Sequence, residues 1–283
     1  MATRTFTLFA TIVASILGSV ESAHSRRRPI RRLEFEPRYD RSITTFDSDG
    51  RMRQVEYGME ASRRGDSIAA MVVPSMNAAF LAVDSSDKVH RIDAHILLIT
   101  AGLAGDGRAL ASALREFCQR FRLSFGEAPT VEEAAICAAG IQHDLTRTAG
   151  ARPLGCTAIV AGFDLSILHD EILPPELYQT EPGGLMEQCT FCAAGSNREA
   201  ILSDLENVVA GLDRTNSASS STDKVVTGML SALFKQENPE IAERKFDVWC
   251  LEYAPGNKVG GNIHCFKGVD EKSASFVAQR MKL

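Results

Sequence analysis

The chain has 283 residues, of which 45% are hydrophobic and 24% charged, a balance typical of a folded globular protein and not of a disordered one. Its formal net charge of -5 argues against a protein that binds nucleic acid mainly through phosphate contacts. Composition and charge therefore exclude fibres, small disulfide scaffolds and polytopic membrane proteins, but they indicate no function.

The N-terminal extension, residues 1–38, has the features of a targeting segment. An uncharged stretch from Phe6 to Val20 follows Arg4 and precedes an arginine cluster between Arg26 and Arg32. This order is typical of a signal peptide, and the stretch is shorter than the about 20 residues of a membrane span. The arginine cluster is also compatible with a nuclear address or a solvated tail.

The cysteines point to a reducing compartment, in conflict with a secretory segment. Their number is seven, and most lie in apolar runs, where a reduced thiol packs as a small hydrophobic group. Cys189 and Cys192 have the spacing of a redox motif. We expect them in an extended run, in which residues three apart face opposite sides, so redox or zinc chemistry is disfavoured.

The first predicted elements are a helix and a hairpin. A helix is expected from Gly50 to Arg64, with Ser48 or Asp49 as its start signal. Two apolar runs, Ser67 to Val73 and Ala78 to Val83, are separated by a short turn and predict a hairpin.

A strand and two helices are predicted next. The strand is expected from Ala94 to Thr100. The first helix then carries one apolar stripe, formed by Leu110, Leu114, Phe117 and Phe121. Thr130 and Glu133 have the spacing of a capping box that begins the second helix.

The second half of the chain repeats this order of strands and helices. Strands are predicted at Cys156 to Phe163, near Ile167 to Leu173 and at Gln188 to Ala194. Ser196 and Glu199 predict a capped helix through Leu212, Thr222 predicts the cap of another, and a last strand is expected from Phe246 to Tyr253. Turns are expected from Ala254 to Asn262.

The order of the elements predicts the fold class. Strands come in sets and helices in pairs, which disfavours an alternating parallel sheet. Strands that are apolar on both faces, such as Cys156 to Phe163, must be covered on both sides. We therefore expect an α+β fold, a four-layer α/β/β/α sandwich of two antiparallel sheets flanked by helix pairs. We expect this sandwich over residues 66–283, preceded by a gate segment and ring helix over residues 39–65.

The segment Tyr39 to Ala61 reads YDRSITTFDSDGRMRQVEYGMEA and resembles the N-terminal signature of proteasome alpha subunits. Its ring-helix signature comprises Gly50, Arg51, Gln54 and Glu56. The resemblance implies a non-catalytic subunit of the 20S core, folded like the N-terminal-nucleophile hydrolases. In that family seven alpha subunits close a ring and gate the entry of substrates for ubiquitin-dependent protein degradation.

The resemblance also implies roles for individual residues. Tyr39, Asp40 and Tyr57 match residues that order the gate, and Ser48 stands in the same segment where the family usually has proline. Lys88 matches the pocket lysine that receives the C-terminal carboxylate of a regulatory particle. The alternative for Lys88 is a surface ion pair with Asp84 or Asp87.

The rival function is an active threonine peptidase of the beta type, which has the same fold. The position that matches its N-terminal threonine nucleophile is Asp66, and a carboxylate cannot replace that hydroxyl. Lys88 and Asp84 fall near the lysine and the acid of the active relatives. The resemblance is weakened by Ser48, by Arg53 in place of an apolar residue, and by a short link over residues 84–87.

The implied partners are other alpha subunits, beta subunits, the C-terminal tails of an activator and the unfolded polypeptide that passes through. No cofactor and no metal are implied. The resemblance implies the cytoplasm and nucleus, whereas the N-terminal 25 or so residues suggest secretory or plastid targeting.

Overall fold

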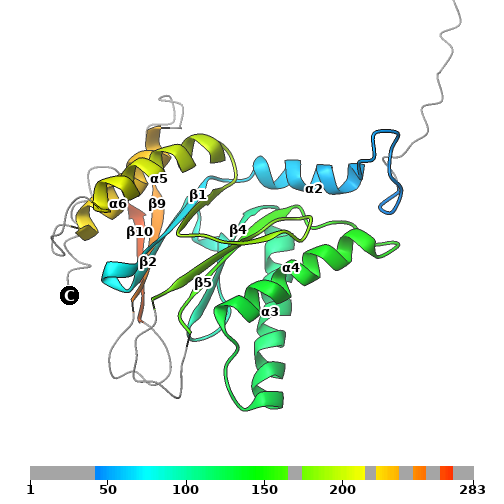
Figure 1. Cartoon of the computed structure of the whole chain (residues 1–283), viewed down its shortest axis with the longest axis horizontal. Coiled ribbons are helices and arrows are strands. Elements are labelled where there is room, and N and C mark those ends of the chain that lie inside the picture. The colour runs from blue at the N-terminus through cyan, green and yellow to red at the C-terminus, as the bar shows by residue number, and fades with distance from the viewer. Residues whose placement is uncertain (1–41, 165–173, 214–220, 236–244, 253–261, 270–283) are drawn as a thin grey trace, which may run out of the picture. The chain divides into compact units, whose positions relative to one another are not determined.

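The computed structural model describes residues 42–164, 174–213, 221–235, 245–252 and 262–269, all within a compact unit that spans residues 39–283. This unit contains two five-stranded antiparallel sheets (Figure 1). The strand order is β10-β9-β2-β1-β8 in the first sheet and β3-β4-β5-β6-β7 in the second. Together with the helices on the outer faces of both sheets, this confirms the predicted four-layer sandwich.

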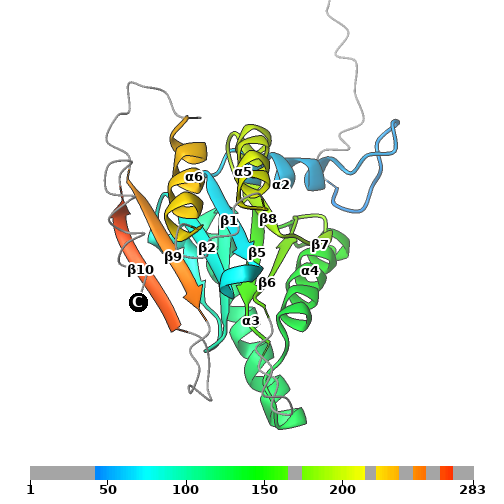
Figure 2. The ribbon, with the colours of Figure 1, turned by 60° about the vertical axis from the view of Figure 1, so that its left-hand side comes forward.

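The first sheet is built on the predicted hairpin. Strands β1 (Ile68–Val73) and β2 (Ala78–Val83) pair along their whole length, and every residue of both is buried. Figure 2 shows β10 at the outer edge of this sheet, beside β9. The remaining strands of the sheet are β8 (Phe191–Ala194), β9 (Phe246–Glu252) and β10 (Asn262–Val269).

The second sheet lies under the first and is covered by two helices. Its strands are β3 (Val89–Arg91), β4 (Ile96–Gly102), β5 (Cys156–Gly162), β6 (Glu176–Thr180) and β7 (Met186–Gln188). Apolar side chains of both sheets, such as Leu81 and Ile159, meet in one buried layer between them. This layer explains why the central strands are apolar on both faces.

Helix pairs form the two outer layers, as predicted. Helices α3 (Ala104–Phe125) and α4 (Val131–Arg147) pack on the second sheet, and α5 (Arg198–Asp213) and α6 (Ser221–Lys235) pack on the first. The Thr130 capping box of α4 is confirmed. The Glu133 N–H donates to the Thr130 hydroxyl over 3.1 Å, and the Thr130 N–H donates to the Glu133 carboxylate over 2.8 Å.

The predicted start of the first helix was wrong. Helix α2 (Arg53–Arg63) begins three residues later than Gly50, which lies in a turn at φ 76°. The Asp47 carboxylate accepts hydrogen bonds from the N–H groups of Asp49 and Arg51, both over 2.9 Å. Asp47, and not Ser48 or Asp49, therefore organises the entry to the helix, because this turn consumes residues 47–51.

Two other predicted caps were also wrong. Helix α5 begins at Arg198, too late for Ser196 to be the residue before it, and the Ser196 hydroxyl lies 3.1 Å from the Gly65 carbonyl oxygen. Helix α6 begins at Ser221, so Thr222 lies inside it. In the first case a contact between distant segments takes the side chain that the local pattern assigned to a cap.

The strands of the second half needed the largest correction. The run predicted from Gln188 to Ala194 is divided between β7 and β8, which belong to different sheets. Strands β3, β6 and β10 were not predicted. The pieces expected near residues 167–173 and the turns at 254–261 lie outside the described residues.

Cys189 and Cys192 do not share one strand, and both pack toward the layer between the sheets. All seven cysteines are free thiols, and burial raises the pKa of Cys192 well above its usual range. Cys189 also has a raised pKa because of burial. Neither thiol therefore has the lowered pKa of a reactive redox cysteine. In the described part of the chain, none of the helices is both long and apolar enough to cross a membrane.

Candidate functional site

The turn before α2 is held by a small charged cluster. The backbone N–H of Arg51 is the chief cause of the lowered pKa of Asp47, and the N–H of Asp49 and the charge of Arg53 act in the same direction, against burial. The Arg53 guanidinium lies 2.7 Å from the Asp47 carboxylate. The departure at Arg53 thus has a partner in the chain, because Arg53 and Asp47 form an ion pair.

The predicted gate residues fall on both sides of the described boundary. Tyr39 and Asp40 lie outside the described residues. Ser48 is exposed in the turn, and Tyr57 lies on α2 with 51% of its surface exposed. Phe46, 59% exposed, adds a second aromatic ring to the surface of this segment. The segment therefore presents large apolar groups to solvent, as a surface made for a neighbouring chain does.

The four residues of the ring-helix signature are not one cluster. Gly50 and Arg51 belong to the turn, and Gln54 and Glu56 lie on α2. The Glu56 carboxylate lies 3.9 Å from the Arg51 guanidinium and 3.8 Å from that of Arg53. These pairs are partly exposed, so they fix the geometry of the turn more than they stabilise the fold.

Asp66 and Lys88 form an ion pair at the end of the segment that joins α2 to β1. The Lys88 ammonium lies 2.6 Å from the Asp66 carboxylate and 3.4 Å from the carbonyl oxygen of Gly102. The Lys88 side chain is only 12% exposed. The sequence analysis placed both residues near the reaction centre of the active relatives but did not predict their pairing, and it considered Asp84 or Asp87 as the partner.

Backbone contacts fix the chain around Asp66. The N–H of Ser196 donates to the Gly65 carbonyl over 2.9 Å, and the Ser67 hydroxyl donates to the Ser196 carbonyl over 2.9 Å. Gly195 has φ +87°, and a Cβ placed there would lie 2.0 Å from the Asp66 carbonyl oxygen. Only glycine fits this approach between the start of β1 and the loop before α5.

A second rigid element is the loop after α4, where Arg152 and Asp106 form a bidentate pair. Both nitrogen-oxygen distances are 2.7 Å, and the buried Gly155 N–H donates to the same carboxylate over 2.8 Å. The hydrogen bonds from Arg152 are the chief cause of the lowered pKa of Asp106, and the Gly155 N–H adds to it, against burial. Asp106 thereby ties the first turn of α3 to the start of β5.

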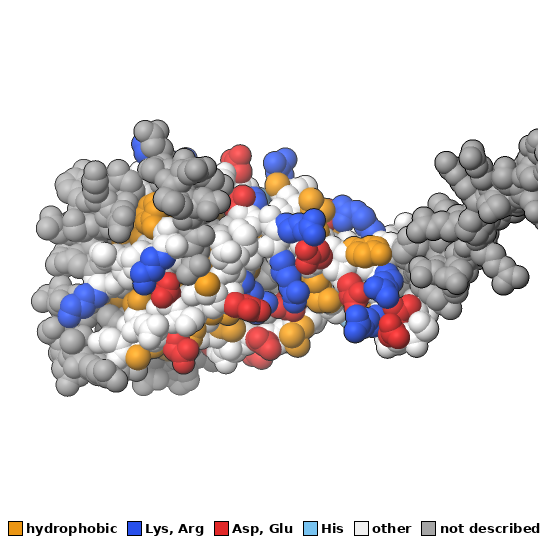
Figure 3. All heavy atoms as spheres, turned by 90° about the horizontal axis from the view of Figure 1, so that it is seen from above, with side chains coloured by type: hydrophobic (Ala, Val, Ile, Leu, Met, Phe, Trp, Pro, Cys, Tyr) orange, Lys and Arg blue, Asp and Glu red, His pale blue; other side chains and the backbone are white. Residues whose placement is uncertain are grey.

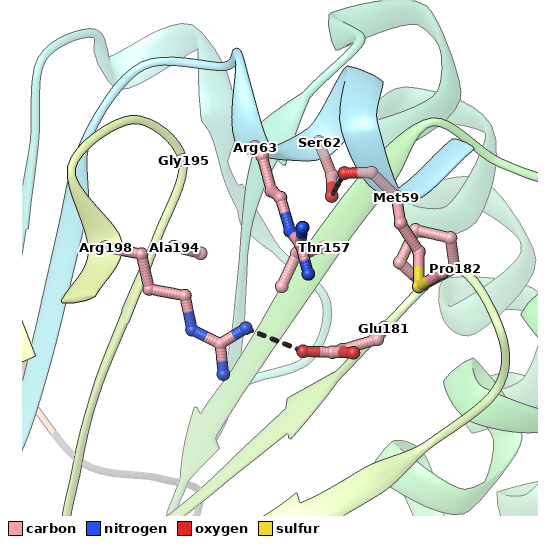
Figure 4. A pocket seen from close by; sticks show the side chains of 9 residues that line it. All are labelled: Met59, Ser62, Arg63, Thr157, Glu181, Pro182, Ala194, Gly195 and Arg198. Atoms are coloured by element: carbon pink, nitrogen blue, oxygen red, sulfur yellow. Dashed lines mark hydrogen bonds and ion pairs between the residues drawn. The ribbon is translucent and has the colours of Figure 1, made fainter. Parts of the chain in front are cut away.

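A small hollow lies between the end of α2 and the start of α5 (Figure 4). One Arg198 nitrogen donates to the Glu181 carboxylate over 2.7 Å, and the Arg63 side chain points into the hollow near Thr157. The lining residues are Met59, Ser62, Arg63, Thr157, Glu181, Pro182, Ala194, Gly195 and Arg198. The sequence analysis missed this site, because its charged residues come from three separate parts of the chain.

Two family models match the chain. The model described as "Proteasome subunit" matches residues 64–243, and the model of the N-terminal signature of A-type proteasome subunits matches residues 39–61. The first covers the sandwich with Asp66 and Lys88, and the second covers the predicted gate residues and most of α2.

Similar curated proteins come from distant organisms. "Proteasome subunit alpha type-7" of Dictyostelium discoideum is 36% identical over 178 residues, which cover 60% of this chain and 69% of that protein. "Proteasome subunit alpha type-7-B" of Arabidopsis thaliana is 38% identical over 180 residues, with the same two shares. "Proteasome subunit alpha type-7" of Trypanosoma brucei brucei is 34% identical over 188 residues, covering 62% of this chain and 73% of that protein.

Proposed function

The chain belongs to the proteasome subunit family as an alpha-type subunit, and from this we propose that it builds and gates the ring without cleaving peptide bonds itself. Membership implies assembly with other proteasome subunits. The observation that carries the non-catalytic role is the Asp66–Lys88 pair of 2.6 Å. A carboxylate held by an ammonium group offers no hydroxyl nucleophile, and the peptide bond after Gly65 leaves no free amine to act as the base.

The gate is proposed to consist of Tyr39, Asp40, Ser48 and Tyr57. The exposure of Tyr57 supports this proposal, because its hydroxyl can reach a neighbouring chain. The turn organised by Asp47 gives the segment a fixed base. A few hydrogen bonds worth about 1 kcal/mol each can be shifted by an activator that binds one state more tightly.

A role for Lys88 in binding the tail of an activator stays a prediction. In the chain its ammonium group is largely buried and already paired with Asp66. A tail carboxylate would therefore have to compete with Asp66 for the same donor. This competition makes Lys88 a less favourable receptor than a lysine exposed in an open groove.

We further propose that the chain occupies the ring position of the type-7 subunits named among its relatives. Its proposed location is the cytoplasm and nucleus, where the particle would admit unfolded, ubiquitin-marked polypeptides. The alternative is targeting through the N-terminal residues. On the face seen in Figure 3, acidic and basic side chains are interspersed, a pattern compatible with charge-matched contacts to neighbours.

The first test is purification of the tagged full chain with its partners. We expect other proteasome alpha and beta subunits to co-purify in one particle, identified by mass spectrometry. An epoxyketone probe should label a beta subunit of that particle and leave this chain unlabelled, because Asp66 is not a nucleophile. Covalent labelling at Asp66 or Ser67 would contradict the non-catalytic role.

The second test concerns the gate. Substitution Tyr57→Ala in the assembled particle should change peptide hydrolysis without activator, since it removes a hydroxyl that orders the segment, and leave the amount of particle unchanged. Tyr39→Ala and Asp40→Ala should act in the same direction. Exposed Arg147→Ala on α4 is the control, because its partner Asp144 lies on the same helix. Equal peptidase rates in all variants, with and without activator, would contradict gating.

A further inference from the structure

The hollow between α2 and α5 carries one unbalanced positive charge. It is lined by two guanidinium groups and one carboxylate, and the Arg198–Glu181 pair uses one of each. In the part of the chain that the structure describes, Arg63 has no carboxylate within ion-pair distance. The Arg63 side chain nevertheless points into the hollow instead of into open solvent (Figure 4).

The two charged walls of the hollow are held in place before any ligand arrives. Arg198 follows Asn197, which has φ 58°, and the loop before it is tied to Gly65 by the Ser196 N–H. Glu181 sits in a turn closed by hydrogen bonds of 3.0 Å from its own N–H to Leu185 and 2.8 Å from the Gly184 N–H to its carbonyl. Binding here would therefore immobilise few additional side-chain rotamers.

Thr157 supplies an independent indication of a ligand. Its residue is only 6% exposed, and its side chain lies beside the Arg63 guanidinium at the base of the hollow. Within the described residues its hydroxyl makes no hydrogen bond, although a buried hydroxyl normally has a partner. A hydroxyl donor next to a guanidinium group is suited to an oxyanion.

The size of the hollow limits what can enter. Its cavity volume is about 10 Å³, roughly the space that one water-sized group requires. Met59 and Pro182 form one apolar wall, which reduces contact with water. A carboxylate at the end of a side chain fits this space, whereas a nucleotide or a length of peptide backbone does not. The rest of the ligand must therefore stay outside, on the surface of another protein.

We propose that this hollow receives an acidic side chain of a neighbouring proteasome subunit, whose carboxylate accepts hydrogen bonds from Arg63 and Thr157. The inference rests on the assembly with other subunits, which supplies such a neighbour at high local concentration. It assigns to Arg63 a role in subunit recognition. Since the ligand's carboxylate leaves water, a charge of the wrong sign or no charge at this position would weaken the contact.

The first experiment measures incorporation into the particle. Tagged wild-type and Arg63→Gln chains are co-expressed, and their ratio in the purified particle is determined by mass spectrometry. Loss of one charge-assisted contact should reduce the share of the variant about tenfold. Arg64→Gln is the matched control, because Arg64 pairs with Glu60 over 2.8 Å and does not line the hollow. Equal incorporation of the two variants would overturn the proposal.

The second experiment identifies the carboxylate directly. Substitution Arg63→Lys places a primary amine in the hollow of the assembled particle, and a water-soluble carbodiimide then couples that amine to an adjacent carboxylate. We expect a crosslinked peptide between position 63 and an acidic residue of a neighbouring subunit, and none from Arg64→Lys. A crosslink to Glu181 of the same chain alone would overturn the proposal. Failure of the wild-type chain to join any particle would instead refute the proposed function.

Discussion

Substitution Gly195→Ala is expected to unfold a large share of the isolated chain. A methyl group at this position meets the Asp66 carbonyl oxygen at 2.0 Å, and φ +87° is a conformation that alanine rarely adopts. The left-handed backbone costs about 1–2 kcal/mol and the clash about 1–3 kcal/mol, together a large part of a typical stability. Urea unfolding followed by circular dichroism measures the loss.

The control for Gly195 is another glycine with open space around it. Gly140 lies on α4, is exposed, and has nothing within 4 Å of the position of an added Cβ. Gly140→Ala should therefore stabilise the chain by about 0.5–1 kcal/mol through helix propensity. If both substitutions changed the free energy of unfolding equally, the close approach of Gly195 to Asp66 could not be what requires glycine.

Substitution Asp106→Ala should destabilise the chain by about 2–4 kcal/mol. It removes the acceptor of the buried Gly155 N–H and both hydrogen bonds from Arg152. The estimate is kept below the full cost of breaking a buried pair, because the Arg152 side chain is 59% exposed. Thermal unfolding of the purified chain at neutral pH measures this effect.

Acidification provides the check on that assignment. The folded-state pKa of Asp106 is lowered, so its stabilisation is complete above the unfolded pKa of about 3.9 and is lost as the pH falls through the folded value. The difference in stability between wild type and Asp106→Ala should therefore narrow at acidic pH. Asp144→Ala, which removes an exposed pair with Arg147, should change stability by less than about 1 kcal/mol. A comparable loss in that variant would contradict the importance of burial.

Local patterns predicted what depends on neighbours in sequence. The β1–β2 hairpin and the Thr130 capping box follow from alternation, turn residues and a spacing of three, and the structure has both. The apolar central strands also required cover on both faces, which led to the four-layer fold. The family signature added the function, because no spacing of residues by itself indicates a ring subunit.

The sequence could not predict contacts between distant segments. Asp66 and Lys88 are brought together only when the β1–β2 hairpin folds, so nothing in their spacing shows the pair. Strand β6 was missed because two of its buried residues, Gln179 and Thr180, are polar. The hollow was missed for the same reason as the pair, since its charges come from α2, the turn after β6 and α5.

The unbroken passage from α2 into β1 has a consequence for the ancestry of the two subunit types. Helix α2 ends at Arg63, and only Arg64 and Gly65 separate it from Asp66. Exposing an amine at residue 66 would require scission of the backbone there, which would detach α2 together with everything before it. One polypeptide of this design can therefore keep its doorway or acquire a cutting edge, but it cannot have both.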